Sequence, residues 1–191
     1  LSPFLMNLCS CLVVILINRG LKEYGGDMAI GAYGIVNRVA FLFVMIILGF
    51  NQGMQPIAGY NFGACRYDRL MRVLKLSIIA ATVVSVSGFL LSQLMPMQCA
   101  RLFTTDQTLM NISATGISTM MIAFPLVGCQ MVITNFFQSI GKAKISMFLS
   151  LSRQMIFLLP LLLLLPLIWG VKGVWWSMPI SDTLSAVATI Y

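Results

Sequence analysis

The 191-residue chain contains no histidine, and only 9% of its residues are charged. Without histidine, neither a Cys/His zinc site nor a histidine-based catalytic triad can be built within it. Five cysteines are present, but Cys9 and Cys11 have the wrong spacing for a CxxC motif. No paired carboxylates occur within the apolar stretches. We therefore expect free thiols, no cofactor and no enzymatic activity.

Hydrophobic residues make up 59% of the chain. A soluble domain of this size could not hide so much apolar surface from water. Six stretches are long enough to cross a bilayer as helices, at about residues 1–18, 28–50, 73–95, 112–137, 145–168 and 171–191. Their weak alternation favours helices over barrel strands. The sequence predicts an all-α integral membrane protein with six transmembrane helices.

The net charge of +7 is distributed in a way that argues for a membrane and against nucleic acid. We call the segments between consecutive predicted spans, with the span-end residues that border them, joins, numbered in chain order. The second and fourth joins hold the larger share of basic residues, namely Arg66, Arg69, Arg72, Lys75, Lys142 and Lys144. The other joins hold four basic residues, diluted by Glu23, Asp27 and Asp106. By the positive-inside rule, we expect the second and fourth joins and both chain ends to be cytoplasmic. Membrane lipid is the expected partner of the surplus cations.

Local signals predict where the helices break. Pro56, Gly59 and Gly63 are expected to end the second helix and turn the chain sharply. After them, the three-residue spacing from Arg66 to Lys75 predicts a cationic stripe on the next helix. Within the fourth span, Pro125 and Gly128 predict a kink, and Thr105 or Asp106 is expected to cap its start. The chain begins without methionine and stops inside an apolar run, so we expect a fragment of a longer membrane protein.

Three ionisable residues lie inside predicted spans: Arg38, Arg153 and Asp182. A charge at the bilayer centre costs about 2.5–3.5 kcal/mol, so each needs a partner or a wet cavity. From the helical rise, Arg153 lies about 12 Å from the inner side and Asp182 about 14 Å. Because these depths agree, we predict an Arg153–Asp182 ion pair. A static clamp between helices is favoured, and a proton- or cation-sensing role for Asp182 stays open.

Other polar residues in the spans are candidates for a substrate cavity: Asn7, Asn37, Arg38, Gln52, Gln130 and Asn135. Such side chains often form hydrogen bonds between helices, and for each one alone this reading is favoured over a ligand contact. Arg38 is expected in the bundle interior, bonded to backbone carbonyls or to a helix outside this chain.

The run from Gly53 to Ala64, GMQPIAGYNFGA, resembles the multidrug and toxic compound extrusion (MATE) transporters, in particular their MepA-like bacterial branch. The matching positions are Gln55, Pro56, Gly59, Tyr60, Asn61, Gly63 and Ala64. Weaker matches lie at Gln138–Lys142, Gly170–Trp175 and Pro179–Asp182. The resemblance therefore extends over nearly the whole chain.

This resemblance implies a twelve-helix antiporter of the bacterial inner (plasma) membrane, built from two six-helix lobes. Residues 1–191 would form the C-terminal lobe, and the N-terminal lobe would be its missing partner. The family exports amphipathic drugs or metabolites in exchange for Na⁺ or H⁺ by alternating access. Some members carry an acidic residue on the first or fourth helix of this lobe, where this chain has Asn7 and Gln130. The coupling carboxylate is therefore expected in the missing N-terminal lobe.

Three other functions are compatible with parts of the sequence. A lipid-linked sugar flippase of the same superfamily should place more basic residues in its cavity than Arg38 alone supplies. A non-transporting membrane scaffold is disfavoured by the polar, proline-interrupted spans, although it stays open. A membrane-embedded enzyme is disfavoured because the spans carry no paired carboxylates, histidines or metal-ligand spacing.

Overall fold

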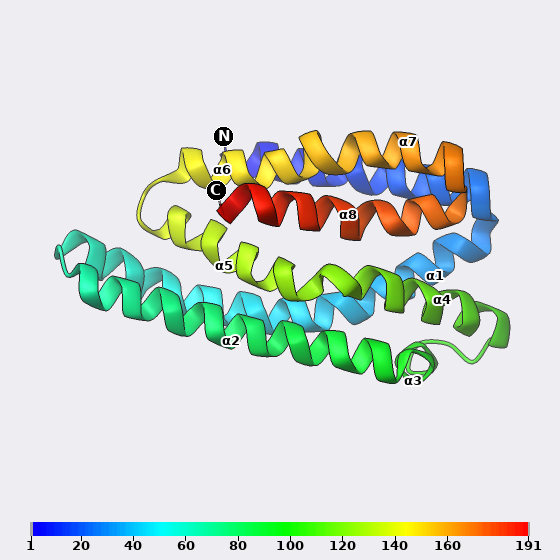
Figure 1. Cartoon of the computed structure of the whole chain (residues 1–191), viewed down its shortest axis with the longest axis horizontal. Helices are drawn as coiled ribbons and strands as arrows, with labels where there is room; N and C mark the ends of the chain where they lie inside the picture. The colour runs from blue at the N-terminus through cyan, green and yellow to red at the C-terminus, as the bar shows by residue number, and fades with distance from the viewer. Residues whose placement is uncertain (1, 191) are drawn as a thin grey trace.

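The computed structural model describes residues 2–190, and at 2–7, 143, 149 and 187–190 it describes the backbone alone. Within this range the chain runs back and forth along one axis in six helical passes (Figure 1). The passes are the two arms of α1, then α2, α4–η1–α5, α6–η2–α7 and α8. No strand occurs among the described residues. The all-α fold class predicted from the sequence is confirmed.

Helix α1 (Ser2–Gly63) contains both of the first two predicted spans. The two arms meet at Gly26, whose φ of 69° and ψ of −168° are not helical. Glycine adopts this positive φ without the clash that a Cβ would cause. Four described stretches are long and apolar enough to cross a membrane: Leu8–Gly63, Tyr67–Leu94, Gln107–Ser139 and Lys144–Trp169. The first of them is folded at Gly26 into two passes.

Helix α1 continues through Pro56 and Gly59 and ends at Gly63, the last of the three residues predicted to end it. Proline removes one backbone donor, and a long helix held by its neighbours tolerates that loss in a membrane. The chain turns at Cys65 instead, with a φ of 55°. The amide of Arg66 bonds to the carbonyl oxygen of Asn61 at 2.9 Å, and that of Cys65 bonds to the oxygen of Phe62 at 3.1 Å. This pattern is a Schellman cap with cysteine in the position that usually holds glycine.

Helix α2 (Tyr67–Leu94) begins directly after this turn, and Arg66 is its N-cap residue. Arg69, Arg72 and Lys75 lie on its first three turns, and all three are exposed. An α-helix turns by about 100° per residue, so each residue three positions further along lies about 60° around the helix axis from the one before. The cationic stripe therefore curves around α2, and its first predicted member, Arg66, precedes the helix.

Two short elements follow at the other end of the bundle. Helix α3 (Pro96–Arg101) starts with proline in its first turn. Amide groups in the first turn make no hydrogen bond within the helix, so the missing amide proton of proline costs nothing there. Helix α4 (Gln107–Met120) is capped by Asp106, whose Oδ1 accepts the amides of Thr108 at 2.9 Å and Leu109 at 3.3 Å. The predicted cap at Asp106 is confirmed.

The remaining passes are interrupted close to their prolines. A 3₁₀ turn, η1 (Met121–Ala123), joins α4 to α5 (Phe124–Ser139) just before Pro125, as the sequence predicts. Helix α5 ends in a second Schellman cap, with Gly141 at a φ of 80°. The last two passes comprise α6 (Ala143–Leu151), the π-helical segment η2 (Ser152–Leu158), α7 (Leu159–Trp169) and α8 (Val171–Ile190).

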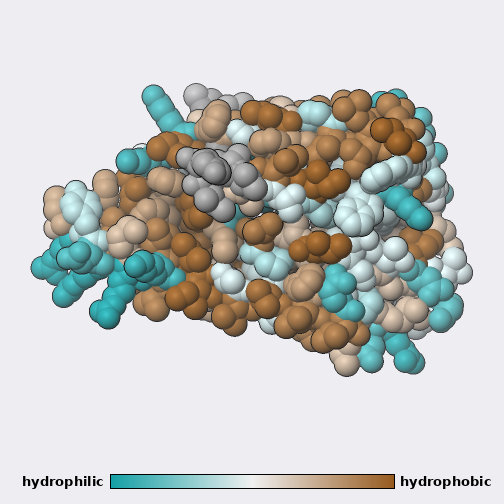
Figure 2. All heavy atoms as spheres, in the orientation of Figure 1, coloured by the Kyte–Doolittle hydropathy of each residue, from teal (hydrophilic) through white to brown (hydrophobic). Residues whose placement is uncertain are grey.

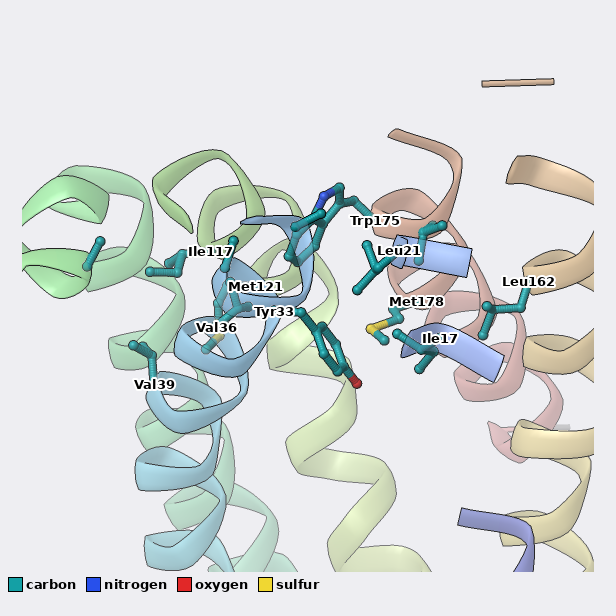
Figure 3. Close-up of a cluster of buried hydrophobic side chains, with 14 of the residues drawn as sticks. Ile17, Leu21, Tyr33, Val36, Val39, Ile117, Met121, Leu162, Trp175 and Met178 are labelled. Carbon is teal, nitrogen blue, oxygen red and sulfur yellow. The ribbon is translucent and has the colours of Figure 1, made fainter. Parts of the chain in front are cut away.

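Two apolar clusters hold the passes together. The larger gathers side chains from α1, α4, η1, α7 and α8 (Figure 3), with the rings of Tyr33 and Trp175 6.2 Å apart. At Gly116 an added Cβ would lie 2.7 Å from the Trp175 ring, so α4 approaches α8 closely. The smaller cluster joins the second arm of α1 to α2 and α5 around Ile47, Met54 and Val132.

Hydrophilic side chains gather toward the ends of the bundle, and hydrophobic ones cover much of the length between them (Figure 2). The described chain ends lie at the same end as the α1–α2 turn and the α5–α6 loop (Figure 1). That end carries six basic residues and Asp68, whereas the other carries four basic and three acidic residues. The topology thus places the basic joins and both chain ends together, as predicted.

The two Schellman caps generate a prediction about stability. Replacing Cys65 by glycine should raise the stability of the purified full-length protein by about 1 kcal/mol, because the left-handed conformation disfavours a Cβ. Replacing Gly141 by alanine should lower stability by a similar amount for the same reason. Thermal unfolding in detergent checks both changes. Equal melting temperatures for Cys65→Gly and the parent protein would contradict the strain at Cys65.

Candidate functional site

An ion pair between η2 and α8 lies at the centre of the candidate site. Arg153 Nε is 3.5 Å from Asp182 Oδ1, and the two side chains are 31% and 20% exposed. The hydroxyl of Ser181 also donates to the backbone carbonyl of Arg153 at 3.2 Å. The structure therefore has the contact that the matching depths predict, between adjacent antiparallel passes.

The π-helical register of η2 sets where Arg153 and Gln154 point. The amide of Leu159 bonds to the carbonyl of Gln154, five residues earlier, just ahead of Pro160. A proline has no amide proton to give the preceding turn, and a π register is one way to accommodate that loss. From this segment, Gln154 Nε2 donates to Ser10 Oγ on the first arm of α1 at 3.0 Å. The sequence gives no sign of the π-helix, so this contact was not predicted.

Two clefts meet at η2. The first, which we call the α5–η2 cleft, has a volume of about 200 Å³. It is lined by Gln130, Met131, Thr134, Asn135, Gln138, Ser150, Arg153 and Gln154. The second, the α1–α8 cleft, has a volume of about 190 Å³. Its lining is mostly apolar and comprises Ser10, Val13, Val14, Ile17, Tyr33, Met120, Arg153, Gln154, Leu158, Met178 and Asp182. Arg153 and Gln154 line both clefts and form the wall between them.

Two amides predicted as cavity residues do line the α5–η2 cleft, but both bond to other helices. Gln130 is 4% exposed, and its Nε2 donates to Ser185 Oγ on α8 at 2.8 Å. Asn135 accepts a hydrogen bond from Gln55 Nε2 on α1 at 3.3 Å. Their hydrogen bonds therefore tie α5 to its neighbours on two sides.

Three other predicted cavity residues, Asn37, Arg38 and Gln52, line neither cleft. Arg38 is exposed on this lobe, so within this chain it is not in the interior, and a bond to a helix outside this chain stays a prediction. The inward face of α1 is taken by Ala32, Val36 and Val39, and Arg38 lies about 200° around the helix from Val36. Gln52 is also exposed and Asn37 is half-buried. The side chain of Asn7 lies outside the described residues.

A buried amide that the sequence did not single out lies one turn before Gln55. Asn51 is 1% exposed, and neither its nitrogen nor its oxygen has a partner among the described residues. The only sequence feature that indicates burial of Asn51 is its helical register with the buried residues Ile47 and Met54. No group of three or more His, Cys, Asp or Glu side chains suited to a metal occurs in the part of the chain that the structure describes.

The motif residues near the end of α1 have structural tasks. An added Cβ at Gly59 would lie 3.3 Å from the carbonyl oxygen of Ser139, so glycine lets α1 approach the end of α5. Asn61 is buried, and its Nδ2 donates to the carbonyl of Ile57 at 2.8 Å. Tyr60 is 74% exposed and points away from the lobe. The motif thus builds the α1–α5 contact and the helix end.

Comparison with known proteins assigns this arrangement to a family. The MatE family model matches residues 1–164. The chain belongs to the MatE family. Its resemblance to MATE transporters, stated from the motif, is confirmed, and so is the predicted membrane character.

Individual relatives match over essentially the whole chain. It is 27% identical over 190 residues to the multidrug export protein MepA of Staphylococcus aureus strain bovine RF122 / ET3-1, covering 100% of this chain and 42% of the relative. The MATE multidrug transporter DinF-BH, solved in complex with rhodamine 6G, is 39% identical and superposes with a TM-score of 0.86 over 99% of this chain and 42% of its own. The Vibrio cholerae MATE transporter VcmN shares the fold, with a TM-score of 0.91 at 18% identity, over 99% of this chain and 43% of its own. The chain thus spans well under half the length of these relatives.

Removing one member of the ion pair should harm the lobe more than removing both. Arg153→Met or Asp182→Leu leaves a lone charge in the bundle and should lower stability by about 1–3 kcal/mol, since both side chains are partly exposed. The double variant leaves no lone charge and should recover most of the loss. Thermal unfolding of the full-length protein in detergent measures the three changes. Losses that simply add in the double variant would show that the pair does not stabilise the lobe.

Proposed function

We propose that this chain is the C-terminal lobe of a secondary transporter that exports amphipathic drugs or metabolites by alternating access, in exchange for Na⁺ or H⁺. The observation that carries the proposal is the match of 99% of the chain to 42% of a MATE multidrug transporter, the share expected of one lobe in two. A missing N-terminal lobe would then supply the other wall of the substrate path.

The carboxylate distribution supports placing the coupling-ion site in that other lobe. Of the five acidic residues in the chain, Asp182 alone lies inside a predicted span, and Arg153 already neutralises it. In this proposal the Arg153–Asp182 pair is chiefly a clamp between η2 and α8. The N-terminal lobe supplies the carboxylate that Na⁺ or H⁺ occupies.

Alternating access requires two arrangements of the lobes whose populations the ion and the substrate shift in opposite directions. The interruptions at η1 and η2 supply bending points within two of the six passes. Helix breaks of this kind are common at functional sites in membrane transporters. Bending there would let the outer half of a pass move while the inner half stays packed.

In the proposed orientation, the α1–α2 turn and the α5–α6 loop face the cytoplasm of a bacterium across its inner membrane. The support is the charge difference between the two ends of the bundle, from which the positive-inside rule predicts the topology. Arg69, Arg72 and Lys75 on the first turns of α2 would then meet the anionic headgroups of the inner leaflet.

Export of rhodamine 6G by cells producing the full-length protein tests the function. Cells with the transporter should retain less dye than cells without it, because an ion gradient drives efflux. A protonophore should abolish the difference if H⁺ is the coupling ion, and removal of external Na⁺ should abolish it if Na⁺ is. Equal retention with and without the transporter would count against this function for the dye, and efflux insensitive to both treatments would contradict cation coupling.

The orientation predicts which thiols an impermeant reagent reaches on intact cells. Cys65 and Cys99 lie at opposite ends of the bundle, so in single-cysteine variants a charged maleimide should label Cys99 and miss Cys65. Burial raises the pKa of the Cys99 thiol. The labelling rate should therefore keep rising with pH beyond the range in which an ordinary thiol is already ionised. Labelling of Cys65 on intact cells would reverse the proposed topology.

A further inference from the structure

We propose that the α5–η2 cleft is an anion subsite, in which Arg153 binds the carboxylate or another acidic group of an amphipathic substrate. This inference rests on the proposed export function and names the chemistry of one part of its substrate. It begins from the charges that lie away from the ends of the spans, which are Arg38, Arg153 and Asp182. The other four acidic residues of the chain lie in or beside the joins between passes. This lobe therefore places a surplus of positive charge in the membrane.

The one carboxylate in the spans is poorly placed to receive a cationic drug. Asp182 Oδ1 already lies 3.5 Å from Arg153 Nε, and the attraction between them must be overcome before either charge is free. Among the described residues, no acidic side chain lines the α5–η2 cleft. An organic cation would meet only the positive Arg153 there.

The guanidinium of Arg153 has donors to spare for a ligand. It carries five N–H groups in a planar fork that matches two oxygens of one acid. Among the described residues, its ion pair with Asp182 engages this fork through Nε. Because Arg153 lines the cleft and is 31% exposed, an acidic group in the cleft lies within reach of the fork.

The rest of the lining fits the same ligand chemistry. Thr134, Ser150 and Gln138 offer further hydrogen-bond donors, and Met131 offers an adaptable apolar surface. Gln130 and Asn135 are held by Ser185 and Gln55, which keeps this wall fixed. A volume of about 200 Å³ is below the roughly 300–1,000 Å³ of sites that hold a whole drug-sized compound. The cleft therefore suits the acidic end of a larger compound whose apolar body lies outside this lobe.

A matched pair of dyes tests the inference. Rhodamine 6G is an ethyl ester, and hydrolysis of the ester gives the free carboxylic acid on the same cationic ring system. Fluorescence anisotropy with the purified full-length transporter measures both dissociation constants, and the ester is the internal reference in every variant. We expect the parent protein to bind the acid at least about tenfold more tightly than the ester, since one charged hydrogen-bonded pair is gained.

Three variants separate an anion subsite from a clamp. Asp182→Asn removes the carboxylate that competes for Arg153, so the preference for the acid should increase. Arg153→Gln combined with Asp182→Asn leaves no lone charge, and it should bring the acid-to-ester ratio to about one. Arg69→Gln is the matched control, because it removes an exposed arginine that lines neither cleft, and it should keep the parent ratio.

The outcomes distinguish the subsite from the export function. Equal affinities for the two dyes in the parent protein, or a preference that persists in the double variant, would overturn the anion subsite. If Asp182→Asn weakens both dyes alike, Asp182 binds the cationic ring and the subsite is overturned as well. Export of rhodamine 6G by cells, together with equal dye affinities, rejects the subsite alone. Absence of both binding and export rejects the subsite and the proposed substrate class together.

Discussion

Hydrocarbon offers no hydrogen bonds to a peptide backbone, and this constraint shapes every pass of the lobe. Where the helix breaks, another group must satisfy the backbone. Two Schellman caps close the helix ends before α2 and α6, and the Asp106 carboxylate caps α4. At η2 the backbone bonds shift to a π register just ahead of Pro160, and Ser181 adds a donor to the Arg153 carbonyl. The polar centre of the lobe therefore lies where the backbone itself departs from regular helix.

The sequence predicts the passes well because hydrophobic length is a direct consequence of bilayer thickness. It predicts the Arg153–Asp182 contact because opposite charges at equal depth have few other partners. Of the three residues predicted to end α1, only Gly63 does so, since lipid and neighbouring helices favour continuation of the helix through Pro56 and Gly59. The turn instead depends on the positive φ of Cys65, a residue that carries no turn signal.

Within the candidate site, the sequence names both charges and two of the lining amides, Gln130 and Asn135, but not the residues that bond to them. Gln154, Ser10 and Ser185 come from three different passes, and only the fold brings them together with Arg153 and Gln130. For Arg38, the sequence indicates the depth of the charge but not which face of the helix carries it. A charge in an apolar run predicts burial in the bundle, yet the faces of one lobe include surface that a second lobe or lipid headgroups can cover. The depth of a residue along a helix can be predicted from the sequence, whereas the side of the helix that is buried depends on which helices pack against it.

The position of Arg153 between two clefts would allow one residue both to hold the lobe together and to bind the proposed ligand. Its Nε faces Asp182 across the α1–α8 cleft, while the same side chain lines the α5–η2 cleft. An acid bound in the α5–η2 cleft would compete with Asp182 for the same charge. Binding there would therefore loosen the clamp between η2 and α8, in the pass where the π-helix already provides a bending point. Substrate recognition and movement of this pass would then be linked through a single ion pair.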